Sequence, residues 1–136
     1  MQLVDAARAY LDVKWRHRGR SRFGIDCVGL PLLAARDIGY AIEDVPEYVR
    51  GAHGYDVVRE IAARTRPASL AELREDLIVL FRDGVYPCHC GILGVSPQGA
   101  WSLVHAYATA GKVVEEPYDR WAGKATHAFA LPDREA

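Results

Sequence analysis

The sequence predicts an α+β domain in which N-terminal helices pack on a C-terminal antiparallel sheet of about five strands. In the first half apolar residues recur at helical spacing, whereas from residue 77 they fall in short runs separated by turns. Helical segments followed by consecutive strands are typical of the α+β class. A chain of 136 residues can bury one hydrophobic core but is short for two. We therefore expect residues 1–136 to form a single domain.

The composition is that of an ordinary globular protein, with 50% hydrophobic and 26% charged residues. The 17 basic residues nearly balance the 18 acidic ones, so no overall charge favours nucleic acid or an anionic membrane. Residues 1–8 contain an acid and a base where a secretory signal needs an apolar core, and no window approaches a membrane span. We expect synthesis in the cytosol, no membrane insertion, and reduced thiols at the three cysteines.

Three helices are expected in the first half. The first has its apolar residues at helical spacing, at Leu3, Ala6, Ala7, Tyr10 and Leu11. The second follows Asp26 and ends at Gly39, after which residues 43–54 form a surface connection. The third includes residues 57–62 and ends before Pro67, and residues 69–72 have a capping-box pattern that predicts a further helical turn.

The second half has the patterns of strands. We expect them at residues 77–81, 88–95, 101–107, 112–116 and 127–131, with turns at 82–84 and 96–99.

Cys27 is the candidate nucleophile. Asp26 is a good helix cap, and a cysteine at the first helical position lies in the positive end of the helix dipole, which favours its thiolate. Pro31 has no N–H for the Cys27 carbonyl, so either the first turn is distorted or the regular helix begins nearer Pro31. The alternative is that Cys27 is a small buried hydrophobic residue.

Two strand histidines, His89 and His105, are the candidate bases. If the hairpin loop is residues 96–98, His89 lies directly opposite His105 on one face of the sheet, whereas a two-residue loop places them on opposite faces. Gly91 shares the face of His89 and is expected to leave open space beside it. The alternative for each histidine is a half-buried strand residue with a structural role.

Residues 14–24 combine five basic side chains with aromatic residues directly before Cys27. We expect this loop to form an electropositive rim that lowers the pKa of the thiol and attracts carboxylate-rich ligands. A nucleic-acid patch or a solvated loop are the alternatives. The rim is favoured because the positive charge is confined to this loop and the rest of the chain is net acidic.

Four segments resemble, in order, the signatures of the NlpC-type bacterial cell-wall cysteine peptidases, which have a compact papain-like fold. They are residues 26–30 (DCVGL), 76–81 (DLIVLF), 89–93 (HCGIL) and 104–107 (VHAY). The resemblance runs from the first helix to Pro132. It is closest to the branch found with bacteriophage and prophage tails, which is also similar in residues 15–24 and 114–121.

The resemblance implies that Cys27 is the nucleophile, His89 the general base and then acid, and His105 the orienting third residue. It implies hydrolysis of an amide in peptidoglycan stem peptides, typically between D-γ-glutamyl and a diamino acid, without a metal or cofactor. The chain differs from the family's pattern at Val28, where serine is frequent, and at Trp15, near where a substrate-binding tyrosine is frequent.

These residues predict how the site works. We expect Arg18 and the rest of the basic loop to hold stem-peptide carboxylates, Asp26 to cap the helix or bind a free amine, and Trp15 to contact substrate. A virion tail, with its other tail proteins as partners, would deliver the chain to the cell wall. The alternatives are an inactive tail-assembly component of the same fold, a thiol acyltransferase or amidase with another substrate, and a zinc site at Cys88, Cys90 and a histidine.

Overall fold

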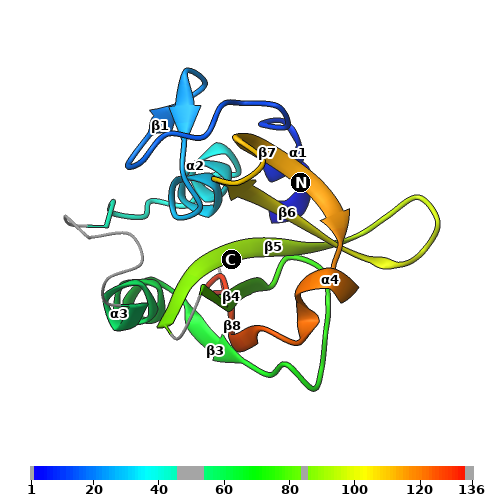
Figure 1. Cartoon of the computed structure of the whole chain (residues 1–136). Helices are drawn as coiled ribbons and strands as arrows, with labels where there is room; N and C mark the ends of the chain where they lie inside the picture. The colour runs from blue at the N-terminus through cyan, green and yellow to red at the C-terminus, as the bar shows by residue number, and fades with distance from the viewer. Residues whose placement is uncertain (1, 46–53, 84–85, 134–136) are drawn as a thin grey trace.

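The computed structural model describes residues 2–45, 54–83 and 86–133 and has the predicted α+β architecture (Figure 1). Most of the expected connection at 43–54 lies outside the described residues. The elements, in chain order, are α1 (Leu3–Arg8), β1 (Arg20–Ser21), β2 (Gly24–Ile25), α2 (Gly29–Asp37), α3 (Gly54–Arg64), β3 (Arg66–Ala68), β4 (Ile78–Asp83), β5 (Tyr86–Val95), β6 (Trp101–Tyr107), β7 (Lys112–Pro117), α4 (Asp119–Ala122) and β8 (Ala125–Ala130).

The main sheet of the described residues has six strands in the order β3-β8-β4-β5-β6-β7, with every neighbouring pair antiparallel. All five predicted strands are present, with ends shifted by a few residues. The additional strand, β3, contains Pro67, which lacks the N–H that a central strand needs. Proline is tolerated there because β3 is an edge strand.

The helices also agree with the prediction, with two exceptions. Residues 69–72 form a turn and no helix, because Ser69 Oγ accepts from the Ala71 N–H at 3.1 Å and Ser69 O accepts from the Glu72 N–H at 3.2 Å. The short helix α4 follows β7 and was not predicted. No helix in the described part of the chain is long and apolar enough to cross a membrane.

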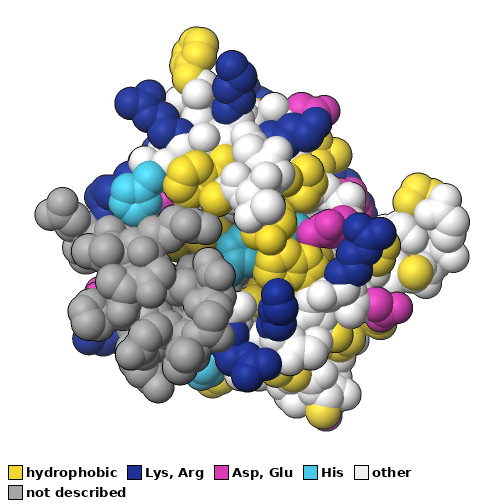
Figure 2. All heavy atoms as spheres, in the orientation of Figure 1, with side chains coloured by type: hydrophobic (Ala, Val, Ile, Leu, Met, Phe, Trp, Pro, Cys, Tyr) yellow, Lys and Arg dark blue, Asp and Glu magenta, His cyan; other side chains and the backbone are white. Residues whose placement is uncertain are grey.

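The sheet is covered on both faces, which explains why residues 77–81 form a continuous apolar run. On one face α1, α2 and α3 pack against Ile78, Leu80 and other residues of the central strands. On the other face Val79 and Phe81 pack against Trp121 of α4. The β1–β2 hairpin lies beside α2 (Figure 1), and Lys and Arg side chains lie at that end of the molecule as well as over the rest of the face in view (Figure 2).

The register of β5 and β6 differs from the prediction. Val95 pairs with Trp101 and Ile92 with Val104, so residues 96–100 form the connection. Continuing this register places Gly91, and not His89, opposite His105. The expectation that His89 lies directly opposite His105 is wrong by two residues. The histidines still share a face because the connection has an odd number of residues.

The expectation that Gly91 leaves open space beside His89 is wrong. A Cβ built on Gly91 would lie 2.6 Å from Leu103 Cδ1 and 2.9 Å from His105 Cβ. The absence of a side chain therefore lets Leu103 and His105 pack directly on the β5 backbone.

Gly91→Ala is expected to lower the free energy of unfolding by about 1–3 kcal/mol, the usual cost of overpacking a core. Urea unfolding measures it. Gly123→Ala is the matched control, because a Cβ there meets nothing within 4 Å and the backbone φ is −68°. That control should stay within about 0.5 kcal/mol of wild type. Equal stability of Gly91→Ala and wild type would contradict the register.

Candidate active site

Cys27 lies two residues before the regular part of α2, which begins at Gly29. The prediction that Cys27 is the first residue of the regular helix is therefore wrong, and the alternative that the regular helix begins nearer Pro31 is confirmed. Asp26 does act as the cap: its Oδ1 accepts from the Gly29 N–H at 2.8 Å, and its carbonyl accepts from the Leu30 N–H at 3.1 Å. The chain thus turns into α2 with Cys27 held between its cap and its first regular turn.

The Cys27 carbonyl has a thiol as its hydrogen-bond partner. In a regular helix this carbonyl would accept from the residue at position 31, but Pro31 has no N–H. The thiol of Cys90, a fully buried residue of β5, donates to it at 2.9 Å. This contact joins the start of α2 to the middle of the sheet. The sequence predicts Cys90 only as a reduced thiol or a zinc ligand, and does not indicate this structural role.

The pKa of the Cys27 thiol is lowered well below its ordinary value. The largest cause is a hydrogen bond between the Cys27 and Cys90 side chains, which is distinct from the contact of Cys90 with the Cys27 carbonyl. The hydrogen bond and positive charge of His89 act in the same direction, against burial and the charge of Asp26. The pKa of Cys90 is raised by the same hydrogen bond and by burial. Of the two thiols, Cys27 is therefore the one that loses its proton more readily.

The two candidate histidines are in direct contact. His89 Nε2 lies 2.7 Å from His105 Nδ1, and the two rings meet edge to face with centroids 5.0 Å apart. Burial lowers the pKa of His105 to about 4, with a further contribution from the charge of His89. His105 is therefore neutral near pH 7. The structure brings Cys27, His89 and His105 together, as predicted from the sequence.

Glu116, at the end of β7, extends this row and was missed by the sequence reasoning. Its Oε1 lies 2.8 Å from His105 Nε2 and accepts from the Trp121 indole N–H at 2.6 Å. Burial acts to raise the pKa of Glu116, but the hydrogen bonds from Trp121 and His105 outweigh it and hold the pKa below the usual value. The sequence does show a glutamate on the strand that follows the strand of His105. The face of the sheet on which this side chain lies depends on the strand register, which the sequence does not reveal.

The second half of the basic loop forms most of the β1–β2 hairpin, and the loop is tied to the site through Asp26. Asp26 Oδ2 accepts from the Arg18 backbone N–H at 2.8 Å, and Asp26 Oδ1 pairs with Arg20 Nη1 at 2.9 Å. Asp26 thus has the predicted capping role, and its oxygens are bonded within the protein. The low pKa of Cys27 comes from Cys90 and His89, so the loop is not the cause that the sequence predicted.

Trp15 is half-buried and packs against the core cluster that contains Cys27. Its backbone N–H donates to the Gly111 carbonyl at 2.9 Å, and its ring lies 6.5 Å from that of His17. The first contact anchors Trp15 to the connection between β6 and β7, and a backbone bridge to Ile25 links Trp15 to the hairpin. A contact of Trp15 or Arg18 with substrate stays a prediction.

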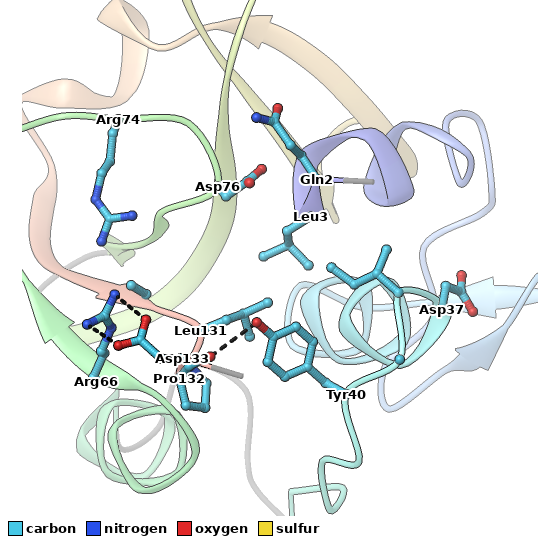
Figure 3. Close-up of a pocket in the computed structure, with 13 residues that line it drawn as sticks. Gln2, Leu3, Asp37, Tyr40, Arg66, Arg74, Asp76, Leu131, Pro132 and Asp133 are labelled. Carbon is cyan, nitrogen blue, oxygen red and sulfur yellow. Dashed lines mark hydrogen bonds and ion pairs between the residues drawn. The ribbon is translucent and has the colours of Figure 1, made fainter. Parts of the chain in front are cut away.

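A separate cavity lies at the other end of α2 from Cys27 and is lined by none of these residues (Figure 3). Its volume is about 680 Å³, and Asp37, Tyr40, Arg66, Arg74 and Asp133 are among its lining residues. Arg66 pairs with Asp133, and the Tyr40 hydroxyl donates to the Pro132 carbonyl. The cavity is therefore separate from the candidate active site.

The zinc alternative receives no support from the described residues, among which no three His, Cys, Asp or Glu are grouped to hold a metal ion. The side chain of Cys88 lies outside the described part of the chain. Cys90, the second proposed ligand, donates to the Cys27 carbonyl instead.

Comparison with known proteins gives matches among solved structures, while no family model and no curated protein matches the chain. The NlpC/p60 domain of peptidoglycan hydrolase SagA matches with a TM-score of 0.66 and 16% identity, over 95% of this chain and 96% of that one. A protein of the NLP/P60 family from Staphylococcus aureus subsp. aureus Mu50, described as similar to lipoprotein, matches with a TM-score of 0.70 and 16% identity, over 97% of this chain and 41% of that one.

An N-acetylmuramoyl-L-alanine amidase from Bacteroides uniformis ATCC 8492 also matches, with a TM-score of 0.63 and 12% identity, over 97% of this chain and 98% of that one. At these identities the likeness shows the fold. The chain has the NlpC/p60 fold, as the sequence resemblance implied.

Cys27 in the wild-type protein is expected to react with iodoacetamide well below about pH 8.5, the ordinary pKa of a thiol. Cys90→Ala should move this reactivity to higher pH, because the hydrogen bond that most lowers the Cys27 pKa is lost. Peptide mass spectrometry of the alkylation at Cys27 across pH measures both profiles.

Cys90→Ser is the control, because its hydroxyl can also donate, and its profile should stay closer to wild type. Alanine also leaves a buried carbonyl without a donor, at a cost of about 1–3 kcal/mol, so circular dichroism must confirm that the variant is folded. An identical profile in folded Cys90→Ala and wild type would exclude this role for Cys90.

Proposed function

We propose that the chain is a cysteine peptidase that hydrolyses an amide bond in peptidoglycan stem peptides. The observation that carries the proposal is the contact between an activated thiol and a hydrogen-bonded histidine pair. A low thiol pKa beside an imidazole, which a second polar group orients, is the arrangement of a nucleophilic cysteine with its general base. In the proposed roles Cys27 is the nucleophile, His89 the base and then the acid, and His105 the orienting residue.

The proposed reaction proceeds through a thioester. The Cys27 thiolate attacks the scissile carbonyl carbon, and the N-terminal end of α2 stabilises the negative charge that develops on the carbonyl oxygen. His89 donates its proton to the leaving amine as the C–N bond breaks. A water molecule then attacks the thioester with His89 as base, and the carboxylic acid product leaves Cys27 free.

The fold supports peptidoglycan as the substrate. The matched domain of SagA belongs to a protein named a peptidoglycan hydrolase, and the Bacteroides uniformis protein is named an N-acetylmuramoyl-L-alanine amidase. For this chain we propose the bond between D-γ-glutamyl and a diamino acid, on the sequence resemblance. The basic hairpin beside Asp26, with Arg18 and Trp15, is the proposed contact surface for the carboxylates of the stem peptide.

Incubation with purified muropeptides is expected to release products cut between D-γ-glutamyl and the diamino acid. Mass spectrometry identifies the bond, and Cys27→Ala should lower the rate by at least about 10³-fold because the nucleophile is absent. Gly123→Ala serves as a control that leaves the site intact. Products cut next to N-acetylmuramic acid would show that the chain hydrolyses a different amide bond of peptidoglycan, and the proposed class of enzyme would stand.

Three results would contradict the proposal. Absence of any product would favour the inactive tail component. Equal activity of wild type and Cys27→Ala would exclude Cys27 as the nucleophile. Turnover of simple thioesters or amides, with muropeptides left intact, would favour the acyltransferase or amidase alternative.

We also propose that the chain acts as part of a bacteriophage or prophage tail, made in the cytosol and carried to the cell wall by the virion. The support is the similarity of residues 15–24 and 114–121 to the tail-associated branch. The two segments supply the basic hairpin and the Glu116–Trp121 contact. Proteomic analysis of particles from the encoding strain should find the chain in purified virions, and its absence from them would contradict this part of the proposal.

A further inference from the structure

A row of hydrogen bonds runs from the candidate nucleophile to a carboxylate on the edge strand β7. The interactions link Cys27 to His89, His89 Nε2 to His105 Nδ1 at 2.7 Å, and His105 Nε2 to Glu116 Oε1 at 2.8 Å. Each neutral imidazole has one nitrogen that donates and one that accepts. If one nitrogen of one histidine is fixed as the donor, the donor and acceptor of every other hydrogen bond in the row are therefore fixed as well.

Glu116 is the residue that can determine the direction of these hydrogen bonds. An ionised carboxylate only accepts hydrogen bonds, so the proton of neutral His105 must be on Nε2, facing Glu116. The bare Nδ1 of His105 then accepts from His89 Nε2. Because Nε2 of His89 is occupied in this way, Nδ1 is the nitrogen left to accept the proton of Cys27.

If the hydrogen bonds ran in the opposite direction, neutral His89 could not act as the base for Cys27. If His105 carried its proton on Nδ1, its bare Nε2 would face the carboxylate, and two acceptors would lie 2.8 Å apart. His89 would then accept at Nε2 and carry its proton on Nδ1, toward Cys27. In that tautomer neutral His89 has no lone pair for the thiol proton.

The surroundings hold the carboxylate and the rings in place. The Trp121 indole N–H donates to the same oxygen of Glu116 at 2.6 Å, and Arg120 Nη1 lies 3.7 Å from the other oxygen. The Trp121 ring meets His105 edge to face at 5.0 Å, and Tyr107 stacks on His105 at 5.2 Å. Aromatic rings thus surround a fully buried His105, where hydrogen-bond direction is not averaged by solvent.

We propose that Glu116 is a positioning residue that fixes the tautomer of His105 and, through it, leaves Nδ1 of His89 free to take the proton of Cys27. This inference rests on the proposed function for its consequence in catalysis, but the tautomer itself can be measured without substrate. When Cys27 transfers its proton, His89 becomes an imidazolium, His105 stays neutral, and Glu116 keeps its negative charge. No proton moves along the row to the carboxylate.

The test is nitrogen-15 NMR of the histidine rings near pH 7, together with steady-state kinetics on muropeptides. In wild type His105 should be neutral and protonated on Nε2. In Glu116→Leu it should shift toward the Nδ1-protonated form, and kcat should fall by about 10²-fold, the lower end of what general acid–base catalysis contributes, with little change in KM.

Two variants separate this role from general stability. Glu116→Gln can keep its oxygen toward Trp121 and His105, so it should retain the tautomer and most of the activity. Glu115→Leu is the matched control on the neighbouring residue, whose carboxylate pairs with Arg8 and accepts from the Ser102 hydroxyl. It should lose stability without any change in the His105 tautomer.

Wild-type His105 protonated on Nδ1, or an unchanged tautomer in folded Glu116→Leu, would overturn the proposal. The wild-type measurement remains decisive if Glu116→Leu does not fold. A wild-type protein with the expected tautomer but no activity on any muropeptide would support the assignment of Glu116 and refute the proposed function, so the two failures are distinct.

Discussion

The hydrogen bond from the Cys90 thiol to the Cys27 carbonyl is the contact on which the arrangement of the site depends. It exists because Pro31 removes the normal helical partner of that carbonyl, and a buried carbonyl without a donor would be costly. The bond connects residues that are far apart in the sequence, one at the start of a helix and one within the sheet. It brings the Cys27 thiol next to β5, on which His89 precedes Cys90.

Burial on both faces of the sheet gives the site its chemical character. Cys27, Cys90, His89 and His105 are each less than 7% exposed, so water screens the interactions between them only weakly. In these surroundings a thiol and two imidazoles cannot all be charged independently. The pKa values of Cys27 and His105 are lowered while that of Cys90 is raised, which divides the roles among chemically similar groups.

Much of the architecture could be predicted from local patterns. The Asp26 cap, the helix after Cys27 and five of the six main strands follow from side-chain chemistry and periodicity, which act over a few residues. Whether the histidines share a face depends only on an odd or even loop length, so that prediction survived a register error of two residues. Cys90 and Glu116 could not be assigned in this way. Their partners are determined by helix packing and by the register of β7, which involve residues distant in sequence. The catalytic roles of Cys27, His89 and His105 stay predictions.

The adjacent glutamates of β7 serve opposite faces of the sheet. Glu115 pairs with Arg8 of α1, while Glu116 contacts His105 and Trp121. Because side chains alternate along a strand, inserting or deleting one residue before this pair would exchange the two environments. Edge strands usually tolerate changes in length, but β7 is constrained on both sides. Evolution of this chain can therefore vary the composition of β7 more readily than its length.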